Sequence, residues 1–166
     1  MIIVGFPCIG KTTVAKKYNN IIDLESTQYH YLTSGTVEEF KGKEYLLKIN
    51  PEWPDNYIRE IIASNKKYDI VFVLSRDYII EIMLSKKIDF IVALPSKGQK
   101  EIYINRAKKR GNNKDFIEGF KKRYSIWRQK LLDLKANKII LNKEEFIEDY
   151  LIKNNIVGDK DESKVY

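Results

Sequence analysis

The feature that most constrains this chain lies at its amino end, where an apolar run leads into a glycine-bounded loop. Residues 1–4 (Met-Ile-Ile-Val) are followed by residues 5–12 (Gly-Phe-Pro-Cys-Ile-Gly-Lys-Thr), which have the spacing G-x-x-x-x-G-K-[ST]. A helix-forming stretch, residues 13–18, comes next, so the loop stands between a strand and a helix. In that setting, N–H groups of the loop and of the helix start converge on an anion. The sequence therefore predicts a phosphate-binding loop whose ligand is a nucleoside triphosphate.

Two side chains of this loop have expected roles. Lys11 reaches the outer phosphates of the nucleotide, and the hydroxyl of Thr12 is placed to bind Mg²⁺. The expected cofactors are therefore ATP and Mg²⁺. The residues predicted to form the nucleotide site are Gly5, Phe6, Pro7, Cys8, Ile9, Gly10, Lys11, Thr12 and Thr13.

Apolar runs that resemble buried strands recur along the 166 residues, with helical patterns between them. They are rich in β-branched residues and nearly continuous in apolar character, as expected for a parallel sheet covered by helices on both faces. This alternation predicts one α/β doubly wound domain. The predicted strands are residues 1–4, 21–24, 69–74, 89–94 and 138–141.

Helix signals fill the intervals. A stripe from Phe116 to Leu134, at steps of three and four, predicts a core-facing helix after Asn113. Helices are also expected over residues 36–47, after the turn at residues 50–54, and after Asn142 as an N-cap. In the helix after the turn, the side chains expected to face inward are Ile58, Ile61 and Ile62.

Composition narrows the classes of partner. The net charge of +7 favours anionic partners such as nucleotides, and supports a nucleic acid only weakly because basic clusters are usually solvated helix faces. The apolar runs fall short of the ~20 residues of a membrane helix, and the start lacks the pattern of a signal peptide. A single cysteine fits a reducing, cytoplasmic setting. The single histidine, His30, excludes a His-rich metal site.

The place of an acidic residue on its strand indicates whether it can contact a ligand, since ligands of open α/β sheets bind beyond the carboxyl ends of the strands. We call this side of the sheet the productive edge. Asp69 and Asp89 begin their strands and are expected to be structural. Asp23 and Glu25 follow the second strand, at the productive edge, and point the same way in extended backbone. Asp23 would hold Mg²⁺ through water, or orient and deprotonate an attacking hydroxyl. Glu25 is expected to contact substrate from the same edge.

The third strand ends at Leu74-Ser75-Arg76 and carries no terminal aspartate of the Walker B type. The patterns D-x-x-G and N-K-x-D are also missing, which disfavours a guanine-nucleotide switch. Arg76 stands at the productive edge, where it would bind a substrate phosphate or lie in solvent.

Three arginines are candidates for stabilising a transferred phosphoryl group. Arg106 and Arg110 are four residues apart on one predicted helix, and Arg123 lies on the next. Phosphoryl transfer needs fixed positive charge on the migrating group, which guanidinium groups supply. The short turn between the two helices would let them close over the triphosphate.

These residues together resemble the P-loop kinases of small molecules, the branch that contains adenylate kinase and other nucleoside monophosphate kinases. The chain is also similar to short kinase-like proteins often carried by bacteriophages, through Asp23–Ser26, Asn50–Tyr57 and Arg110–Asn112. The resemblance implies a three-layer α/β/α fold with a five-stranded parallel sheet ordered 2-3-1-4-5. It further implies a kinase domain over residues 1–153 with a short helical lid at about 97–123, followed by a polar tail over 154–166.

By the same resemblance, the phosphoryl acceptor would bind to a helical region at about residues 29–68. Asn56 and Tyr57, with Trp53 and Arg59, are the candidates to contact it there. The chain departs from adenylate kinase in lacking the larger lid insertion and a clear match to the acceptor-side arginine pattern.

The expected function is an ATP- and Mg²⁺-dependent kinase of a nucleotide, foremost a nucleoside or deoxynucleoside monophosphate. Two alternatives stay open at this point: a kinase of a nucleoside or of a 5′-hydroxyl polynucleotide, and a nucleotide-binding regulatory protein without turnover. The expected assembly is a monomer or a homodimer, with no membrane partner.

Overall fold

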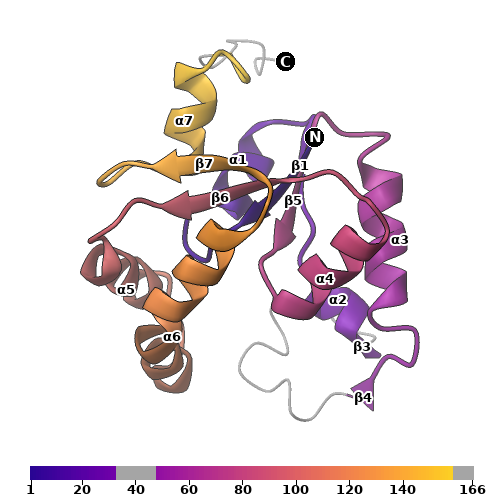
Figure 1. The fold of residues 1–166 in the computed structure, drawn as a ribbon, viewed down its shortest axis with the longest axis horizontal. Coiled ribbons are helices and arrows are strands. Elements are labelled where there is room, and N and C mark those ends of the chain that lie inside the picture. The colour runs from indigo at the N-terminus through magenta and orange to yellow at the C-terminus, as the bar shows by residue number, and fades with distance from the viewer. Residues whose placement is uncertain (33–47, 159–166) are drawn as a thin grey trace, which may run out of the picture.

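The computed structural model describes residues 1–32 and 48–158. It is an α/β structure built on a five-stranded sheet in which every neighbouring pair of strands is parallel (Figure 1). The strands of this sheet are β1 (Ile2–Gly5), β2 (Ile21–Asp23), β5 (Ile70–Leu74), β6 (Ile91–Pro95) and β7 (Asn137–Leu141).

The strands lie in the order β2-β5-β1-β6-β7. The labels differ from the expected 2-3-1-4-5 because a two-stranded sheet that the sequence did not predict, β3 (Tyr31–Leu32) with β4 (Lys48–Ile49), takes two numbers. Counted along the chain, the strands of the large sheet lie in the order second, third, first, fourth, fifth. The chain runs from β1 through α1 to β2 on one side of β1, and it later crosses from β5 through α4 to β6 on the other side. The carboxyl end of β1 is therefore the point where such sheets form a ligand crevice.

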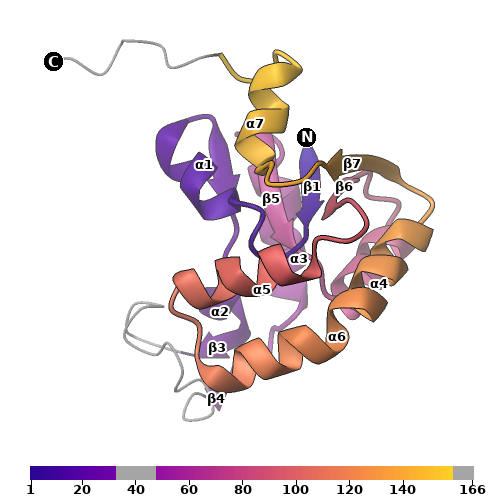
Figure 2. The same ribbon diagram turned by 90° about the vertical axis from the view of Figure 1, so that its left-hand side faces the viewer.

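Helices flank both faces of the sheet (Figure 2). The short helix α1 packs against α7 and β2, whereas α6 packs against β6 and α5. Strand residues of the centre, such as Ile3, Val73 and Val92, are fully buried between these layers, as expected when a parallel sheet is covered on both sides. The helices are α1 (Lys11–Lys17), α2 (Thr27–His30), α3 (Asp55–Ser64), α4 (Asp77–Ser85), α5 (Lys100–Lys109), α6 (Lys114–Asp133) and α7 (Ile147–Lys153).

The long helix α6 begins as the sequence predicts, since the Asn113 side chain accepts a hydrogen bond from the Phe116 N–H at 2.8 Å. Its stripe is buried at Phe120, Tyr124 and Leu131, but Phe116 is 37% exposed. In α3, Ile58 and Ile61 are buried as expected, whereas Ile62 is exposed.

The last helix starts later than predicted. The Asn142 N–H donates to the Glu145 carboxylate at 2.7 Å, which closes a turn rather than opening a helix. The helix begins only at Ile147, where the Asp149 carboxylate accepts from the Phe146 N–H at 2.7 Å. The predicted helix over residues 36–47 lies outside the described residues. Across residues 1–32 and 48–158, no helix combines the length and the apolar character that a membrane span requires.

Candidate functional site

The glycine-bounded loop lies at the carboxyl end of β1 and runs directly into α1. Gly10 caps the helix at φ 98°, a conformation that a side chain would strain. The Lys11 ammonium lies inside the loop and donates to the backbone oxygens of Gly5 at 3.2 Å and Phe6 at 3.3 Å. A Cβ on Gly5 would come within 2.6 Å of the Lys11 side chain, so glycine is needed there too. Both glycines of the motif thus shape the loop around its lysine.

A cavity of about 540 Å³ opens beside this loop. Its wall is formed on one side by the start of α1 and on the other by the ends of β2 and α5. Five of the nine loop residues predicted for a nucleotide line it: Cys8, Gly10, Lys11, Thr12 and Thr13.

The other four predicted residues, among them Pro7, do not line the cavity. Gly5 ends β1, and the side chains of Phe6 and Ile9 are fully buried. The ring of Phe6 packs edge-on against Tyr103 at 5.8 Å and Tyr124 at 5.2 Å between centroids. The prediction that Phe6 and Ile9 belong to a nucleotide-binding loop concerns their backbone N–H groups, and it stays a prediction. The side chains of Phe6 and Ile9 anchor the loop in the core.

The pair that bears on metal binding is Thr12 with Asp23. Asp23 ends β2, and its carboxylate accepts a hydrogen bond from the Thr12 hydroxyl at 2.6 Å. Among the described residues, no group of three or more His, Cys, Asp or Glu is arranged to hold a metal. Magnesium nevertheless fits the pair, because Mg²⁺ in nucleotide sites uses one or two protein oxygens together with phosphates and waters. Glu25 lines the same cavity, and its carboxylate accepts from the Thr27 hydroxyl at 3.2 Å.

Positive charge surrounds the loop. Burial lowers the pKa of Lys11, and the Asp23 carboxylate opposes that shift. Burial also raises the pKa of the Cys8 thiol, against the opposing charges of Arg110 and Lys11. Arg110 lies at the end of α5, beside Cys8, and has no ion-pair partner within the described ranges. Lys16 and Lys109 also line the cavity, which suits a polyanionic ligand.

Arg106 has a different role from the one predicted, although it lines the same cavity. Its guanidinium donates to the backbone oxygens of Cys8 at 3.4 Å and Glu144 at 2.8 Å. It also lies over the rings of Phe146, at 3.7 Å from the centroid, and Tyr103, at 4.7 Å. Through these contacts Arg106 ties the loop to the segment before α7.

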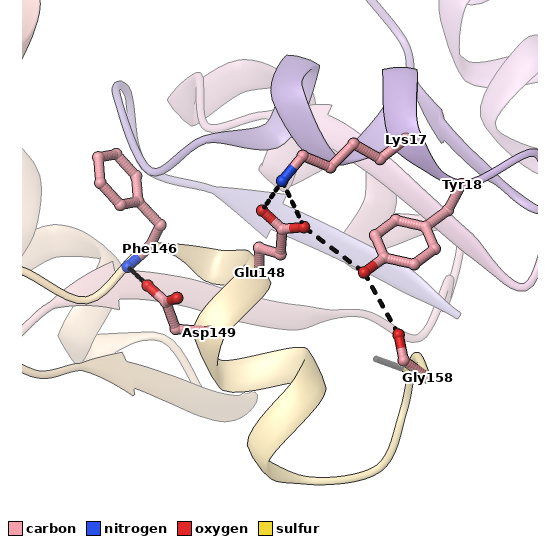
Figure 3. A network of polar contacts seen from close by, with 6 residues as sticks. All are labelled: Lys17, Tyr18, Phe146, Glu148, Asp149 and Gly158. Carbon is pink, nitrogen blue, oxygen red and sulfur yellow. Dashed lines mark hydrogen bonds and ion pairs between the residues drawn. The ribbon is translucent and has the colours of Figure 1, made fainter. Parts of the chain in front are cut away.

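A second set of contacts holds α7 against α1 (Figure 3). The Lys17 ammonium forms an ion pair with the Glu148 carboxylate at 2.7 Å, and the Tyr18 hydroxyl donates to Gly158 at 3.4 Å. The Ile147 N–H donates to the backbone oxygen of Ile9 at 2.9 Å. Helix α7 thus braces α1 and the glycine-bounded loop.

Two predicted arginines lie elsewhere. Arg76 and Arg123 line a different cavity, between the start of α4 and α6. The two helices of the predicted lid therefore carry their arginines to separate places, with Arg110 at the cavity beside the glycine-bounded loop and Arg123 at the second cavity. The expectation that Arg123 joins Arg106 and Arg110 over the triphosphate is corrected for this structure.

The predicted acceptor residues on α3 are structural. Tyr57 is fully buried, and its hydroxyl donates to the backbone oxygen of Leu24 at 2.9 Å and accepts from the Leu74 N–H at 3.3 Å. The Asn56 amide donates to the backbone oxygen of Tyr29 at 2.8 Å. Tyr57 and Asn56 thus join α3 to the ends of β2 and β5 and to α2, so the expectation that they bind the acceptor is corrected.

Sequence reasoning missed Phe146, which lines the cavity and packs against the loop. A Cβ on Gly10 would lie 3.2 Å from its ring. Its position in the sequence could have indicated this, because Phe146 follows the carboxyl end of the last predicted strand, where ligands of such sheets bind. No protein-family model matches the chain, and no curated protein was found to match it.

Proposed function

We propose that this chain is an ATP- and Mg²⁺-dependent phosphotransferase of the P-loop kinase type, with the three-layer fold of that class, acting on a nucleotide. One observation carries the proposal: Lys11, the Thr12–Asp23 pair and Arg110 converge on one cavity at the carboxyl end of β1. These are a lysine that would bind phosphate, a pair of oxygens that would hold a metal, and a guanidinium without an ion-pair partner among the described residues. Phosphoryl transfer requires these three kinds of group.

Each group has a part in the transfer. The loop N–H groups and Lys11 would hold the β- and γ-phosphates of ATP, with the α1 start supplying further N–H donors. Thr12 and Asp23 are the residues that would hold Mg²⁺, which neutralises phosphate charge when bound. Arg110 would stabilise the charge that develops on the moving phosphoryl group. Phe146, 42% exposed at the rim of the cavity, offers an apolar surface for the base.

The acceptor we propose is a nucleoside or deoxynucleoside monophosphate. Its phosphate oxygen is already anionic and needs no general base. Asp23 is held by the Thr12 hydroxyl, a position suited to the metal side of the triphosphate. A hydroxyl acceptor, whether a nucleoside or a polynucleotide 5′ end, would instead require Asp23 to remove a proton.

The direct test is to incubate the protein with γ-labelled ATP, Mg²⁺ and a panel of nucleosides, nucleoside monophosphates and 5′-hydroxyl oligonucleotides. Labelled diphosphate from at least one monophosphate, abolished by Lys11→Ala, is the expected result. Label on nucleosides or oligonucleotides alone would replace the proposed acceptor class. ATP binding without label on any acceptor would support a non-catalytic nucleotide-binding protein.

A further inference from the structure

A second cavity, also of about 540 Å³, opens between the start of α4 and α6. It lies close to the first along the chain, since Leu74 lines the first cavity and the next residue, Ser75, lines the second. Both cavities therefore open at the carboxyl end of β5. A molecule in the second cavity would lie at the same edge of the sheet as the phosphate loop.

The charged side of this cavity suits an anion. Arg76 and Arg123 are both exposed, and neither forms an ion pair within residues 1–32 and 48–158. The first N–H groups of α4 lie at the same place, because Arg76 caps this helix without a side-chain hydrogen bond. The one carboxylate of the wall, Asp77, is already paired with Lys130. Two guanidinium groups and a helix start thus remain available to a phosphate.

A buried polar group without a partner lies directly beneath the wall of this cavity. Ser75 lines the cavity and is 2% exposed, and its hydroxyl has no hydrogen-bond partner among the described residues. Buried hydroxyls in native structures normally have a partner. The Ser75 hydroxyl is closed off from the open cavity, so a ligand would meet it only after a small shift of the cavity wall.

The other side of the cavity is apolar and partly aromatic. Phe116 and Ile126 are 37% and 63% exposed on α6. The indole N–H of Trp127 donates to the backbone oxygen of Ser75 at 2.8 Å, which holds this ring next to the end of β5. A fixed indole next to exposed apolar side chains is a surface on which a planar base can pack.

We propose that this cavity binds the phosphoryl acceptor, a nucleoside monophosphate whose phosphate lies between Arg76 and Arg123 and whose base packs on the Phe116–Trp127 side of α6. The inference rests on the proposed function. It moves the acceptor from the α3 region to α6, where the described structure offers both charge and apolar surface.

The transfer balances without a protein base. A non-bridging oxygen of the acceptor phosphate attacks the γ-phosphorus of ATP. The bond between that phosphorus and the β,γ-bridging oxygen breaks, and its electron pair leaves with ADP. The products are a nucleoside diphosphate and ADP, and no proton moves because the attacking oxygen is anionic.

Binding can be measured at the cavity itself. The chain has two tryptophans, so Trp53→Phe leaves Trp127 as the only one. We expect AMP, GMP, CMP, UMP or dTMP to change the Trp127 fluorescence in a saturable way. Inorganic phosphate, unphosphorylated nucleosides and a 5′-hydroxyl oligonucleotide form the comparison arms. ATP affinity is measured separately by calorimetry on the unsubstituted protein.

Arg76→Ala and Arg123→Ala, each introduced into Trp53→Phe, should weaken monophosphate binding about tenfold or more, as expected for the loss of a charge-assisted hydrogen bond. ATP affinity should stay within about twofold in both. Lys122→Ala is the matched control, because Lys122 is the exposed neighbour of Arg123 on α6 and does not line the cavity. Calorimetry on each variant without Trp53→Phe checks that the fluorescence reports the same event.

The outcomes separate the two proposals. If ATP does not bind at all, the proposed function fails. If ATP binds but no monophosphate changes the Trp127 signal, or both arginine variants bind it as tightly as the parent, the acceptor site is wrong and the donor site stands. If phosphate alone binds as tightly as the nucleotides, the base does not pack on α6. Saturation by the oligonucleotide alone would contradict a small-molecule acceptor.

Discussion

The Thr12 hydroxyl donates to the Asp23 carboxylate across 2.6 Å and so joins the start of α1 to the end of β2. The two residues are eleven positions apart, and within residues 1–32 and 48–158 neither belongs to a cluster of three or more potential metal ligands. Asp23 thus stands where it can take the part that a Walker B aspartate would have at the end of β5. That strand ends at Leu74 and continues into Ser75 and Arg76.

Substitution of Asp23 by asparagine should therefore act through the metal. We expect Asp23→Asn to lower turnover with a monophosphate acceptor by about 10- to 100-fold, the loss usual for groups that orient a metal. Raised Mg²⁺ should restore part of it. Initial rates across a Mg²⁺ titration measure both effects. A loss of about 10⁴-fold that Mg²⁺ does not relieve would instead identify Asp23 as a general base for a hydroxyl acceptor.

Arg110→Ala should slow phosphoryl transfer without weakening ATP binding. Its guanidinium lies beside the loop without an ion-pair partner in the described part of the chain, so its charge is available to the transition state. The expected loss in kcat is about 10³-fold or more. Lys108→Ala, on the same helix but outside the cavity, is the control and should retain the parent rate. Equal rates for Arg110→Ala and the parent would remove Arg110 from the mechanism.

Arg106→Ala should behave differently, because Arg106 holds the fold of the site together. Its donors reach Cys8 and Glu144, so the substitution loosens the loop from the segment before α7. We expect a loss of about 1–3 kcal/mol in unfolding free energy, which corresponds to a fall of roughly 3–10 °C in Tm. ATP should also bind more weakly. Thermal unfolding followed by circular dichroism measures the change, and Arg110→Ala is the comparison, because Arg110 is proposed to act on the phosphoryl group and not on the fold. An unchanged Tm for Arg106→Ala would refute the positioning role of Arg106.

Cys8 should react slowly for a cysteine in a cationic site. Burial raises its pKa above the ordinary 9.0, so at pH 8 a smaller fraction is thiolate than in a free peptide. Alkylation by iodoacetamide should therefore be slower than that of a model thiol, with a rate that is still rising above pH 9. Since the native state favours the protonated thiol, this group's contribution to stability is full below pH 9 and is lost as pH rises through the raised pKa.

The chain holds one cysteine, so the mass gained on alkylation reports Cys8 alone. Mg²⁺ with ATP should protect it, because Cys8 lines the donor cavity. Arg110→Ala should slow alkylation further by removing a charge that favours the thiolate. Reaction faster than the model thiol at pH 8 would contradict the raised pKa.

The local signals of the fold were strong enough to predict its main strands. Continuous apolar runs bounded by polar residues marked each strand of the large sheet, and the loop spacing placed Gly10 at the start of α1. Because ligands of such sheets bind beyond the carboxyl ends of the strands, the sequence also separated Asp23, at the end of a strand, from Asp69, at the start of one. Asp69 instead accepts from the Asn20 amide at 2.6 Å, at the opposite edge. These features depend on periodicity and on strand direction, both of which the sequence carries.

The errors arose where tertiary contacts decide. Arg106 and Arg110 share a helix, and nothing in their spacing shows that backbone oxygens of a distant loop occupy Arg106. Tyr57 is a polar-tipped aromatic on an amphipathic helix, and burial of its hydroxyl depends on carbonyls brought together only by β2 and β5. The place of Arg123 depends on how α6 packs across the sheet. A stripe of apolar residues shows which face of a helix is buried. It does not show what lies next to the polar face, where Arg123 stands.

Gly119 offers a test that separates stability from acceptor binding. It lies within α6, and a Cβ there would come within 2.9 Å of the Arg123 guanidinium. Because that atom is the end of a flexible side chain, Gly119→Ala should displace Arg123 rather than break the helix. The helix itself should gain up to about 1 kcal/mol from replacement of glycine, or about 2–4 °C in Tm. We therefore expect a more stable protein that binds the monophosphate more weakly and ATP unchanged.

The matched control is Ser125→Ala, at an exposed position of the same helix that does not line the second cavity. It should raise stability by a few tenths of a kcal/mol through helix propensity and leave acceptor affinity unchanged. Thermal unfolding measures the stability of each variant, and calorimetry measures its affinities for AMP and for ATP. If Gly119→Ala gains stability and binds AMP as tightly as the parent, the guanidinium is free to move without loss, and Arg123 does not hold the acceptor phosphate. If it binds ATP more weakly as well, Arg123 acts on the donor and the separation between the two cavities fails.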